Sequence, residues 1–318
     1  MIDHNLLYRI AAGKRPFSLG SEKYDVLLSA FNLSGRVQKL FELIPATQKY
    51  WVIHNEYAFE DNELPKVGRL LRSDSSHEDE FIADIVKGLD VPLSEVSRLC
   101  IDITGFMRAH IMFLMHYLKA MGVQSFDMLY TEPSHYARRA DTVFSIDVTE
   151  VRQVSGFEGA HAADVSNDLL VVGVGYDHPL ITNVIANKSN AKLLQLLSLP
   201  SLSADMYQES VVRLQKVGDA PFRVPDEFLA YASANDPFVT YMVLDEAIAK
   251  FAMKHTAPTN IYLSSLATKP QAVGFALYYV DKLSAKPSSI VMPFAKKYSK
   301  ETGTGVGRSW VYPITWIN

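Results

Sequence analysis

Continuous apolar runs alternate, in the first part of the chain, with segments whose apolar residues recur at helical spacing. The amphipathic segments include VQKLFELI and SSHEDEFIADIVKGL. The apolar runs begin the following segments: Tyr24–Phe31, Lys49–Glu56, Leu99–Gly122 and Ser125–Pro133. Strands that are apolar throughout are typical of a parallel sheet covered on both faces by helices. The first part of the chain therefore predicts alternating strands and helices around such a sheet.

The second part of the chain repeats this order of elements. The segment Asp168–Ile185 matches the first strand and its helix, and AKLLQLLSLPS matches the second strand. The segment Ile261–Ser284 has the same strand, small-residue loop and helix as Leu99–Gly122, and SSIVMPFAKKY matches the last strand. This order favours a tandem duplication, although any doubly wound fold is self-similar at this level.

The pattern predicts an α/β fold with two tandem Rossmann-like, doubly wound parallel sheets. We expect the first half over residues 1–140, a connecting segment over 141–167 and the second half over 168–318. The connecting segment alternates like an antiparallel pair of strands, and a further strand is expected at WVYPITWI near the end of the chain. Right-handed crossovers would place every loop that follows a parallel strand at one edge of its sheet.

Composition narrows the class of protein. The 318 residues carry a net charge of −4, which disfavours bulk binding to nucleic acid or to an anionic membrane. The single cysteine, Cys100, lies in an apolar run and is expected to be buried and inert. Without a second cysteine, an apolar leader or a membrane-length apolar run, we expect a cytoplasmic protein.

The loops after the first strand of each half are candidate anion sites, because helix N-termini and backbone N–H groups face outward there. GVGYDH lacks the third glycine and the later acidic residue of a dinucleotide fingerprint, so no nicotinamide or flavin cofactor is expected. Asp177, before His178 and Pro179, could equally be a helix cap. The candidate binding residues of these two loops are Asn32, Ser34, Gly35 and Arg36, and Gly173, Gly175, Tyr176 and Asp177.

A second pair of loops carries a cation at matched positions. Arg108 follows Thr104 and Gly105 in DITGFMR, and Lys269 follows Ser265 and Thr268 in SSLATK. A cation in the first turn of a helix opposes the helix dipole, which favours an anion beside it. The alternative is that both side chains reach solvent or pair with nearby acids such as Asp102 or Glu132.

These loops resemble the Thr-Gly-Gly-Thr-Lys-like loop of the CRISPR-associated Rossmann-fold (CARF) sensor domains. TGFMR keeps Thr104, Gly105 and a cation, whereas SLATK keeps Ser265, Thr268 and Lys269; neither copy has the full motif. The resemblance implies that two such domains pair about a twofold axis and bind a cyclic oligonucleotide between them. A tandem duplication would be that dimer fused into one chain, a pseudo-dimer.

Catalytic residues are harder to assign. No nucleophile elbow, Walker loop or metal-ligand spacing is present, so no metal site is expected. His110, in an apolar helix, is expected to be a core residue. Should the loops process a bound nucleotide, the first candidates for a base or nucleophile are His54, Glu132, His178 and Asp236, the last of which could equally cap a helix.

Three hypotheses follow. The first is a sensor in antiviral defence that binds a small nucleotide or another phosphate-bearing ligand and signals to a protein partner. The second is a nucleotide-processing hydrolase or phosphodiesterase at the same site. The third is a scaffold subunit of a defence complex, in which the aromatic-rich C-terminal segment contacts a partner.

Overall fold

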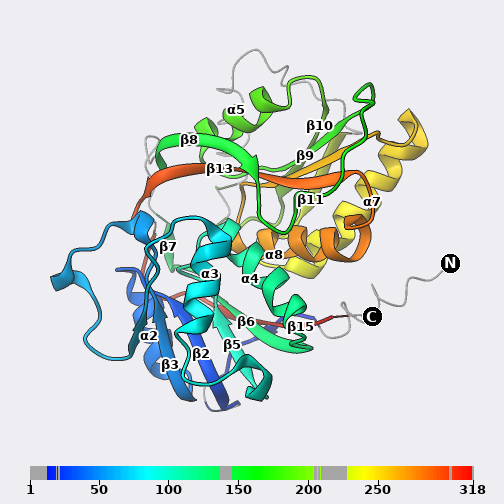
Figure 1. The fold of residues 1–318 in the computed structure, drawn as a ribbon. Helices are drawn as coiled ribbons and strands as arrows, with labels where there is room; N and C mark the ends of the chain where they lie inside the picture. Colours follow the sequence, from blue (N-terminus) through cyan, green and yellow to red (C-terminus); the bar gives the residue numbers. More distant parts are fainter. Residues whose placement is uncertain are drawn as a thin grey trace. The chain divides into compact units, whose positions relative to one another are not determined.

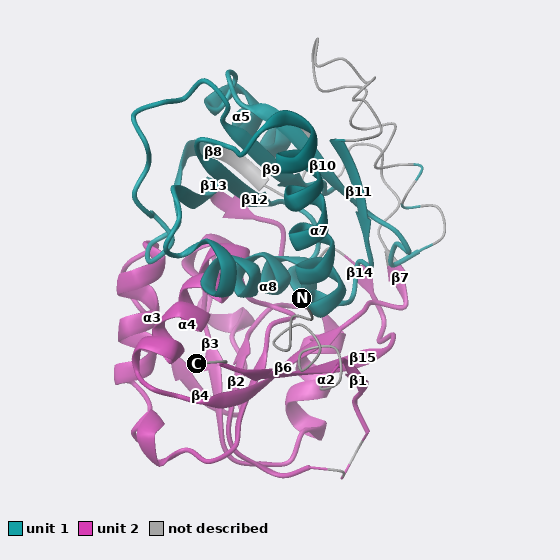
Figure 2. Ribbon diagram, turned by 90° about the vertical axis from the view of Figure 1, so that its right-hand side faces the viewer, with its two compact units in different colours: residues 1–10, 148–294 teal, residues 11–147, 295–318 magenta. Residues whose placement is uncertain are grey.

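A computed structural model describes residues 13–18, 20, 22–136, 145–203, 206, 208, 228–300 and 303–316. The chain divides into two compact units, coloured separately in Figure 2. Of the described residues, unit 2 contains those up to 147 and those from 295 onward, and unit 1 contains those from 148 to 294. Among these residues, no helix is both long enough and apolar enough to cross a bilayer.

Unit 2 is built on a seven-stranded sheet with the order β1-β15-β6-β5-β2-β3-β4 (Figure 1). Its strands are β1 (Arg15–Pro16), β2 (Tyr24–Ala30), β3 (Ala46–Val52), β4 (Arg69–Leu71), β5 (Leu99–Asp102), β6 (Ser125–Thr131) and β15 (Ser309–Thr315). Its helices are α2 (Gly35–Leu43), α3 (Glu78–Lys87) and α4 (Arg108–Ala120). Strands β2 to β6 are mutually parallel, as their apolar sequences predict.

Unit 1 is built on a six-stranded sheet with the order β11-β10-β9-β12-β13-β8. Its strands are β8 (Ser145–Gln153), β9 (Leu169–Gly173), β10 (Lys192–Ser198), β11 (Leu229–Ala232), β12 (Ile261–Ser265) and β13 (Ser288–Tyr298). Its helices are α5 (His178–Asn187), α7 (Pro237–His255) and α8 (Lys269–Tyr278), the last continued by a π-helical turn at Tyr279–Leu283. The expected α/β class is confirmed.

The two sheets have the same strand order. From β15 to β4 the order is β15-β6-β5-β2-β3-β4, and the matching order in unit 1 is β8-β13-β12-β9-β10-β11. The strand pairs matched from the sequence, β2 with β9, β3 with β10, β5 with β12 and β6 with β13, occupy equivalent positions. The sheets also contain strands that the apolar pattern did not reveal, β1 and β4 in one and β11 in the other.

The C-terminal strand departs from the predicted division of the chain. The second half was expected to extend from 168 to 318, but β15 pairs antiparallel with β6 and belongs to unit 2 (Figure 2). This pairing buries Val311, Tyr312 and Ile314 to exposures of 3%, 0% and 0%. An apolar strand is compatible with either sheet, so only tertiary packing selects the partner.

The connecting segment also differs from the prediction. Residues 145–153 form one long strand, β8, at the edge of the second sheet, where an antiparallel pair of strands was expected. The chain after β8 is tied to β13, because the Val154 amide donates to the Ile290 carbonyl and the Ile290 amide donates to that of Phe157, at 2.9 and 3.0 Å. The segment therefore extends a sheet instead of only joining two halves.

Candidate functional site

The order of strands reverses between β2 and β5 in unit 2. Helix α2 follows β2 toward β3, whereas α4 follows β5 toward β6, so the loops after β2 and β5 diverge from neighbouring strand ends. Ser29 in β2 is in register with Asp102 in β5, which places both loops at the same edge. Such a switch point is where open α/β sheets bind ligands. It brings together the candidate residues of both loops: Asn32, Ser34, Gly35, Arg36, Thr104, Gly105 and Arg108.

A buried polar network holds the two strand ends together. The Ser29 hydroxyl donates to Asp102 Oδ2 at 2.9 Å, and the Thr104 amide donates to Asp102 Oδ1 at 3.0 Å. The Thr104 hydroxyl accepts the Thr131 amide of β6 at 3.0 Å. Ser29, Asp102 and Thr104 are each 0% exposed. Thr104, which was predicted to bind a ligand, therefore links the end of β5 to the end of β6 by a hydrogen bond in this structure.

The N-terminus of α2 carries an unusual buried cation. Arg36 lies in the first helical turn and is 5% exposed, and its Nε and Nη1 atoms make no hydrogen bond within the described part of the chain. Ser34, at the N-cap position, is 2% exposed, and its hydroxyl also makes no hydrogen bond to any described residue. The Ser34 amide instead donates to Asn32 Oδ1 at 3.0 Å, which orders the turn. No acidic residue lies in the first turn of α2 to balance Arg36.

Tyr57 links this turn to the loop after β5. Its hydroxyl donates to the Gly105 carbonyl at 2.9 Å. Burial raises the pKa of Tyr57 to about 12, whereas a hydrogen bond with Asn32 and the charges of Arg36 and Arg108 lower it. Both arginines therefore lie within electrostatic range of one buried phenol. Arg108 itself is half-buried at the start of α4.

Gly105 is required by a close backbone approach. A Cβ atom at this position would lie 1.8 Å from the Ala30 carbonyl oxygen at the end of β2. No other residue fits there unless the strand ends move apart. This role is structural, and it sets how closely the two switch-point loops approach one another.

The second sheet has an equivalent switch point between β9 and β12. Gly173 is in register with Ser265, and a Cβ atom at Gly175 would lie 1.9 Å from the Leu266 carbonyl oxygen. Ser265 is 0% exposed, and its hydroxyl makes no hydrogen bond to the residues that the structure describes. Asp177 occupies the N-cap position of α5, without a side-chain capping bond, and Tyr176 precedes it.

The loop after β12 caps helix α8 and does not leave its backbone N–H groups available to an anion. The Thr268 hydroxyl accepts the Gln271 amide at 3.3 Å and donates to the Ala234 carbonyl, and the Gln271 side chain returns to the Thr268 amide. This capping box satisfies donors that an anion would otherwise use. Lys269 is half-buried as the first residue of α8. Among the candidate anion-binding loops, those of unit 2 therefore leave more donors available than the capped start of α8 does.

The catalytic candidates are dispersed and mostly have structural partners. Glu132 accepts the Trp310 indole N–H at 2.8 Å and lies 3.5 Å from Arg308 Nε, so the residue after β6 contacts both β15 and the residue before it. Asp236 caps α7 by accepting the amides of Phe238 and Val239 at 3.0 and 3.1 Å, in agreement with its alternative interpretation. His178 is the first residue of α5.

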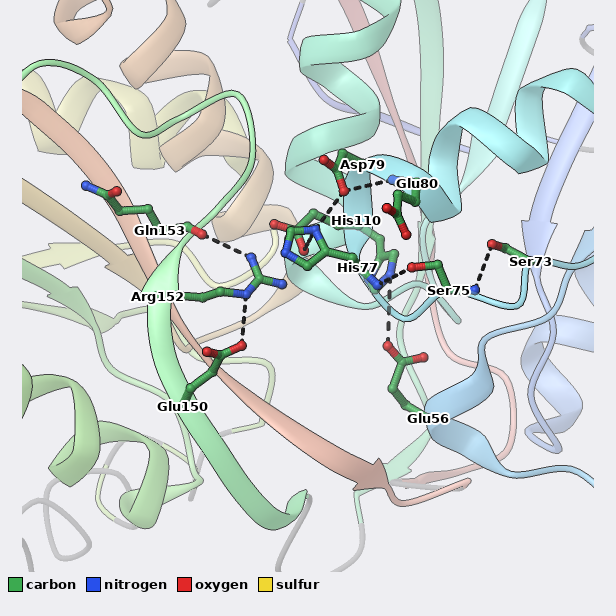
Figure 3. Close-up of polar contacts among 11 residues, drawn as sticks. Glu56, Ser73, Ser75, His77, Asp79, Glu80, His110, Glu150, Arg152 and Gln153 are labelled. Atoms are coloured by element: carbon green, nitrogen blue, oxygen red, sulfur yellow. Dashed lines mark hydrogen bonds and ion pairs between the residues drawn. The ribbon is translucent and has the colours of Figure 1, made fainter.

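His54 lies in a buried group that the sequence did not predict. His54 Nδ1 is 3.8 Å from Glu56 Oε2. His110 Nε2 of α4 is 3.9 Å from Glu56 Oε1, and Figure 3 shows His110 and Glu56. The exposures of His54, Glu56 and His110 are 1%, 8% and 2%. The ligand atoms that the three side chains offer all lie within 4.8 Å of one another. We call these three residues the His–Glu–His cluster.

The surroundings of the His–Glu–His cluster are apolar and contain a second acid. The ring of Phe81, from α3, stacks on that of His54 with centroids 4.8 Å apart and lies edge-on to His110. Burial raises the pKa of Glu56, its own backbone hydrogen bond lowers it, and the charge of Glu78 raises it again. Glu78, the first residue of α3, is 0% exposed.

Only the fold brings the cluster together. His54 and Glu56 are separated by one residue after β3, which is an ordinary loop spacing, and His110 lies more than fifty positions later in an apolar helix. The pair His54-x-Glu56 at the end of a buried strand was the one local signal. We expected no metal site because the sequence contains no metal-binding motif. The three residues of the cluster are close in space but do not form such a motif along the chain.

Comparison of the chain with protein-family models, curated proteins and solved structures finds no match. The binding and metal sites considered for this chain therefore rest on the positions of its own residues.

Proposed function

We propose that the switch point of unit 2 binds a phosphate-bearing anion of nucleotide type, as the ligand site of a sensor protein. The observation that carries the proposal is Arg36. Its guanidinium is buried at the N-terminus of α2, and its Nε and Nη1 atoms have no hydrogen-bond partner among the described residues.

The energetics of Arg36 favour an anionic ligand. Burying a charged group without a partner costs several kcal/mol, and the helix dipole adds to that cost when the charge is positive. An anion at this position would offset both costs. It would pair with the guanidinium and accept hydrogen bonds from the N–H groups at the start of α2. A surface arginine at a helix N-terminus would carry no such argument.

Phosphate suits the donors better than a single carboxylate. Ser34, Arg36 and Arg108 could offer a hydroxyl and two guanidinium groups, and planar guanidinium forks match the paired oxygens of phosphate. Helix N-termini beside a switch point hold phosphate groups in many nucleotide-binding sheets. The CARF-like resemblance of TGFMR adds a cyclic oligonucleotide to the ligands worth testing.

The matched strand order of the two sheets supports a tandem duplication, and with it the proposal that the chain is a pseudo-dimer of Rossmann-like units. In that arrangement the loops of unit 1, including Tyr176, Asp177 and Lys269, would contribute a second binding surface. The capped start of α8 favours a weaker contribution from unit 1 than from unit 2.

The test is a binding titration of the full chain with inorganic phosphate, adenosine monophosphate and cyclic di- and tetra-adenylate. Arg36→Gln should weaken binding about tenfold or more, since a charge-assisted hydrogen bond contributes about 1.5–3 kcal/mol. Lys39→Gln is the matched control, because Lys39 is an exposed cation on the same helix and should bind as the wild type does.

A stability measurement separates a ligand residue from a structural one. If Arg36 serves the ligand, Arg36→Gln should leave the melting temperature unchanged or raise it, because it removes a buried charge whose Nε and Nη1 atoms have no hydrogen-bond partner among the described residues. Loss of stability together with unchanged binding would refute the proposal, as would failure of all four probes to bind the wild-type chain.

Product analysis distinguishes the sensor from the phosphodiesterase. A bound cyclic oligonucleotide should be recovered intact after long incubation with the protein. Recovery of linear or shortened products that disappear in the Arg36→Gln variant would establish the hydrolase alternative instead.

A further inference from the structure

We propose that the His–Glu–His cluster of unit 2, formed by His54, Glu56 and His110, is a binding site for a divalent transition-metal ion such as zinc. The inference rests on observations other than those for the anion site and stands independently of the proposed function. It assigns chemistry to three buried side chains that neither the sequence motifs nor the anion site explain.

The first argument is the set of donor atoms. Two imidazoles and one carboxylate form the ligand set typical of catalytic zinc sites and of non-haem iron sites, in which further positions remain for water or a ligand. Each oxygen of Glu56 faces a different histidine, Oε2 toward His54 and Oε1 toward His110. Figure 3 shows Glu56 and His110 directed toward one another.

The second argument is distance. Donors bound to one zinc ion at 2.0–2.2 Å in tetrahedral geometry are about 3.4 Å apart. The separations of 3.8 and 3.9 Å between Glu56 and the two histidines exceed this value only slightly. They are longer than a hydrogen bond, so the geometry suits a shared ion better than direct contacts between the side chains.

The third argument is charge. Glu56 Oε2 is buried and makes no hydrogen bond within the described ranges, while the charge of Glu78 lies close enough to affect Glu56. Two buried carboxylates in an apolar surround repel one another, and a divalent cation would neutralise both. Glu78 is therefore placed to act as a fourth ligand or as an outer-shell acceptor.

The position of the cluster is also suitable for a bound ion. His54 and Glu56 follow β3 and His110 lies in the first turn of α4, so all three lie near the edge of the sheet that carries the switch point. Phe81 and Phe106, both 0% exposed, pack against the His54 ring. Rings held in this way keep their nitrogens oriented, which is what a metal site requires of its ligands.

The experiment is a metal titration of the full-length chain after treatment with a chelator and dialysis. We expect one equivalent of Zn²⁺ or Co²⁺ to bind tightly, measured by competition with a chromophoric chelator. Co²⁺ should give visible absorption bands of a low-coordinate site, and NMR should show paramagnetically shifted histidine N–H resonances. The NMR measurement uses the wild-type chain and does not depend on any variant folding.

Variants then locate the site. Glu56→Gln, which preserves the shape of the side chain, and His110→Ala should each weaken Co²⁺ binding at least about 100-fold, since even outer-shell changes cost up to that much. His161→Gln is the control, because His161 is an exposed histidine of unit 1 and should not alter binding. Circular dichroism and thermal melting show whether each variant is folded.

Two outcomes would overturn the metal site. One is failure of the wild-type chain to bind either ion at stoichiometric levels. The other is tight binding that survives Glu56→Gln and His110→Ala, which would place the ion elsewhere. Neither result bears on phosphate binding at Arg36, so the two proposals fail separately.

Discussion

The Ser29 hydroxyl donates a 2.9 Å hydrogen bond to the Asp102 carboxylate, and both residues are fully buried. This bond joins β2 and β5 where the order of strands reverses, directly below the loops that carry the candidate ligand residues. This contact is therefore one of those that set the position of the proposed anion site.

Ser29→Ala should lower the free energy of unfolding by about 1–3 kcal/mol, because it removes a buried hydrogen bond to a carboxylate. Urea denaturation monitored by circular dichroism measures the loss. Ser125→Ala, at an exposed position at the start of β6, is the control and should be neutral to within about 0.5 kcal/mol. A neutral Ser29→Ala would show that the bond does not stabilise the strand pair.

Gly105→Ala and Gly175→Ala should each destabilise the protein by about 3 kcal/mol, since a Cβ atom would meet a backbone carbonyl oxygen at 1.8 or 1.9 Å. Gly35→Ala is the control, because no heavy atom outside its neighbouring residues and its own helix backbone lies within 4 Å of the added Cβ, and it should change stability by less than about 1 kcal/mol. Thermal melts of the three variants test this ranking. Equal stability of all three would contradict the close approach of the loops.

Asp236→Ala should cost about 1 kcal/mol, with a range of about 0.5–2, through loss of the two hydrogen bonds that begin α7. Glu246→Ala, an exposed change on the same helix, should cost much less. Chemical denaturation of both variants gives the comparison. If Asp236→Ala were as stable as the wild type, the cap would contribute nothing.

Cys100 should not react with a disulfide reagent in the folded protein. Burial, followed by the charges of Asp102 and Asp127, raises the pKa of its thiol well above its ordinary value, and the thiolate is the reactive form. We expect no reaction in native buffer at pH 8 and one equivalent in denaturant. Rapid reaction under native conditions would show that the seven-stranded sheet of unit 2 opens readily around β5.

The same raised pKa makes stability depend on pH. The unfolded chain loses the Cys100 proton above about pH 8.5 while the folded chain keeps it, so the free energy of unfolding falls as pH rises. Between pH 7.5 and 9.5 the thiol should account for about 1.4 kcal/mol of that fall. Cys100→Ala should remove this part of the slope, which urea titrations at the two pH values measure. An identical slope in the variant would exclude the thiol as its source.

Local sequence was sufficient for most of the strands and helices and for the position of the candidate binding loops. Parallel strands that are buried on both faces are apolar throughout, so Tyr24–Ala30 and Ile261–Ser265 could be recognised from the sequence alone. Because the carboxyl ends of parallel strands share an edge, the loops after β2 and β5 could be expected to meet. Whether they bind an anion remains a prediction.

The roles of individual side chains within those loops could not be predicted in this way. Thr104 and Thr268 belong to the same motif in the sequence. In the structure, Thr104 links two strands by a hydrogen bond, whereas Thr268 caps a helix. Arg36 and Arg108 are both cations in the first turn of a helix. The fold buries Arg36, whereas Arg108 is only half-buried, and the sequence does not indicate this difference. Hydrogen-bond partners and burial depend on neighbours that are distant in the sequence.

The sequence by itself determined the α/β class, the alternation of strands and helices and the edge where the candidate ligand loops lie, because these depend on contacts along or between adjacent segments. Tertiary structure alone decided that β15 joins β6 and that His110 of α4 meets His54 and Glu56. An apolar strand pairs with whichever sheet buries its side chains, and the sequence around a histidine in an apolar helix does not indicate which residues that histidine faces. Contacts between segments far apart in the chain are a property of the packed fold.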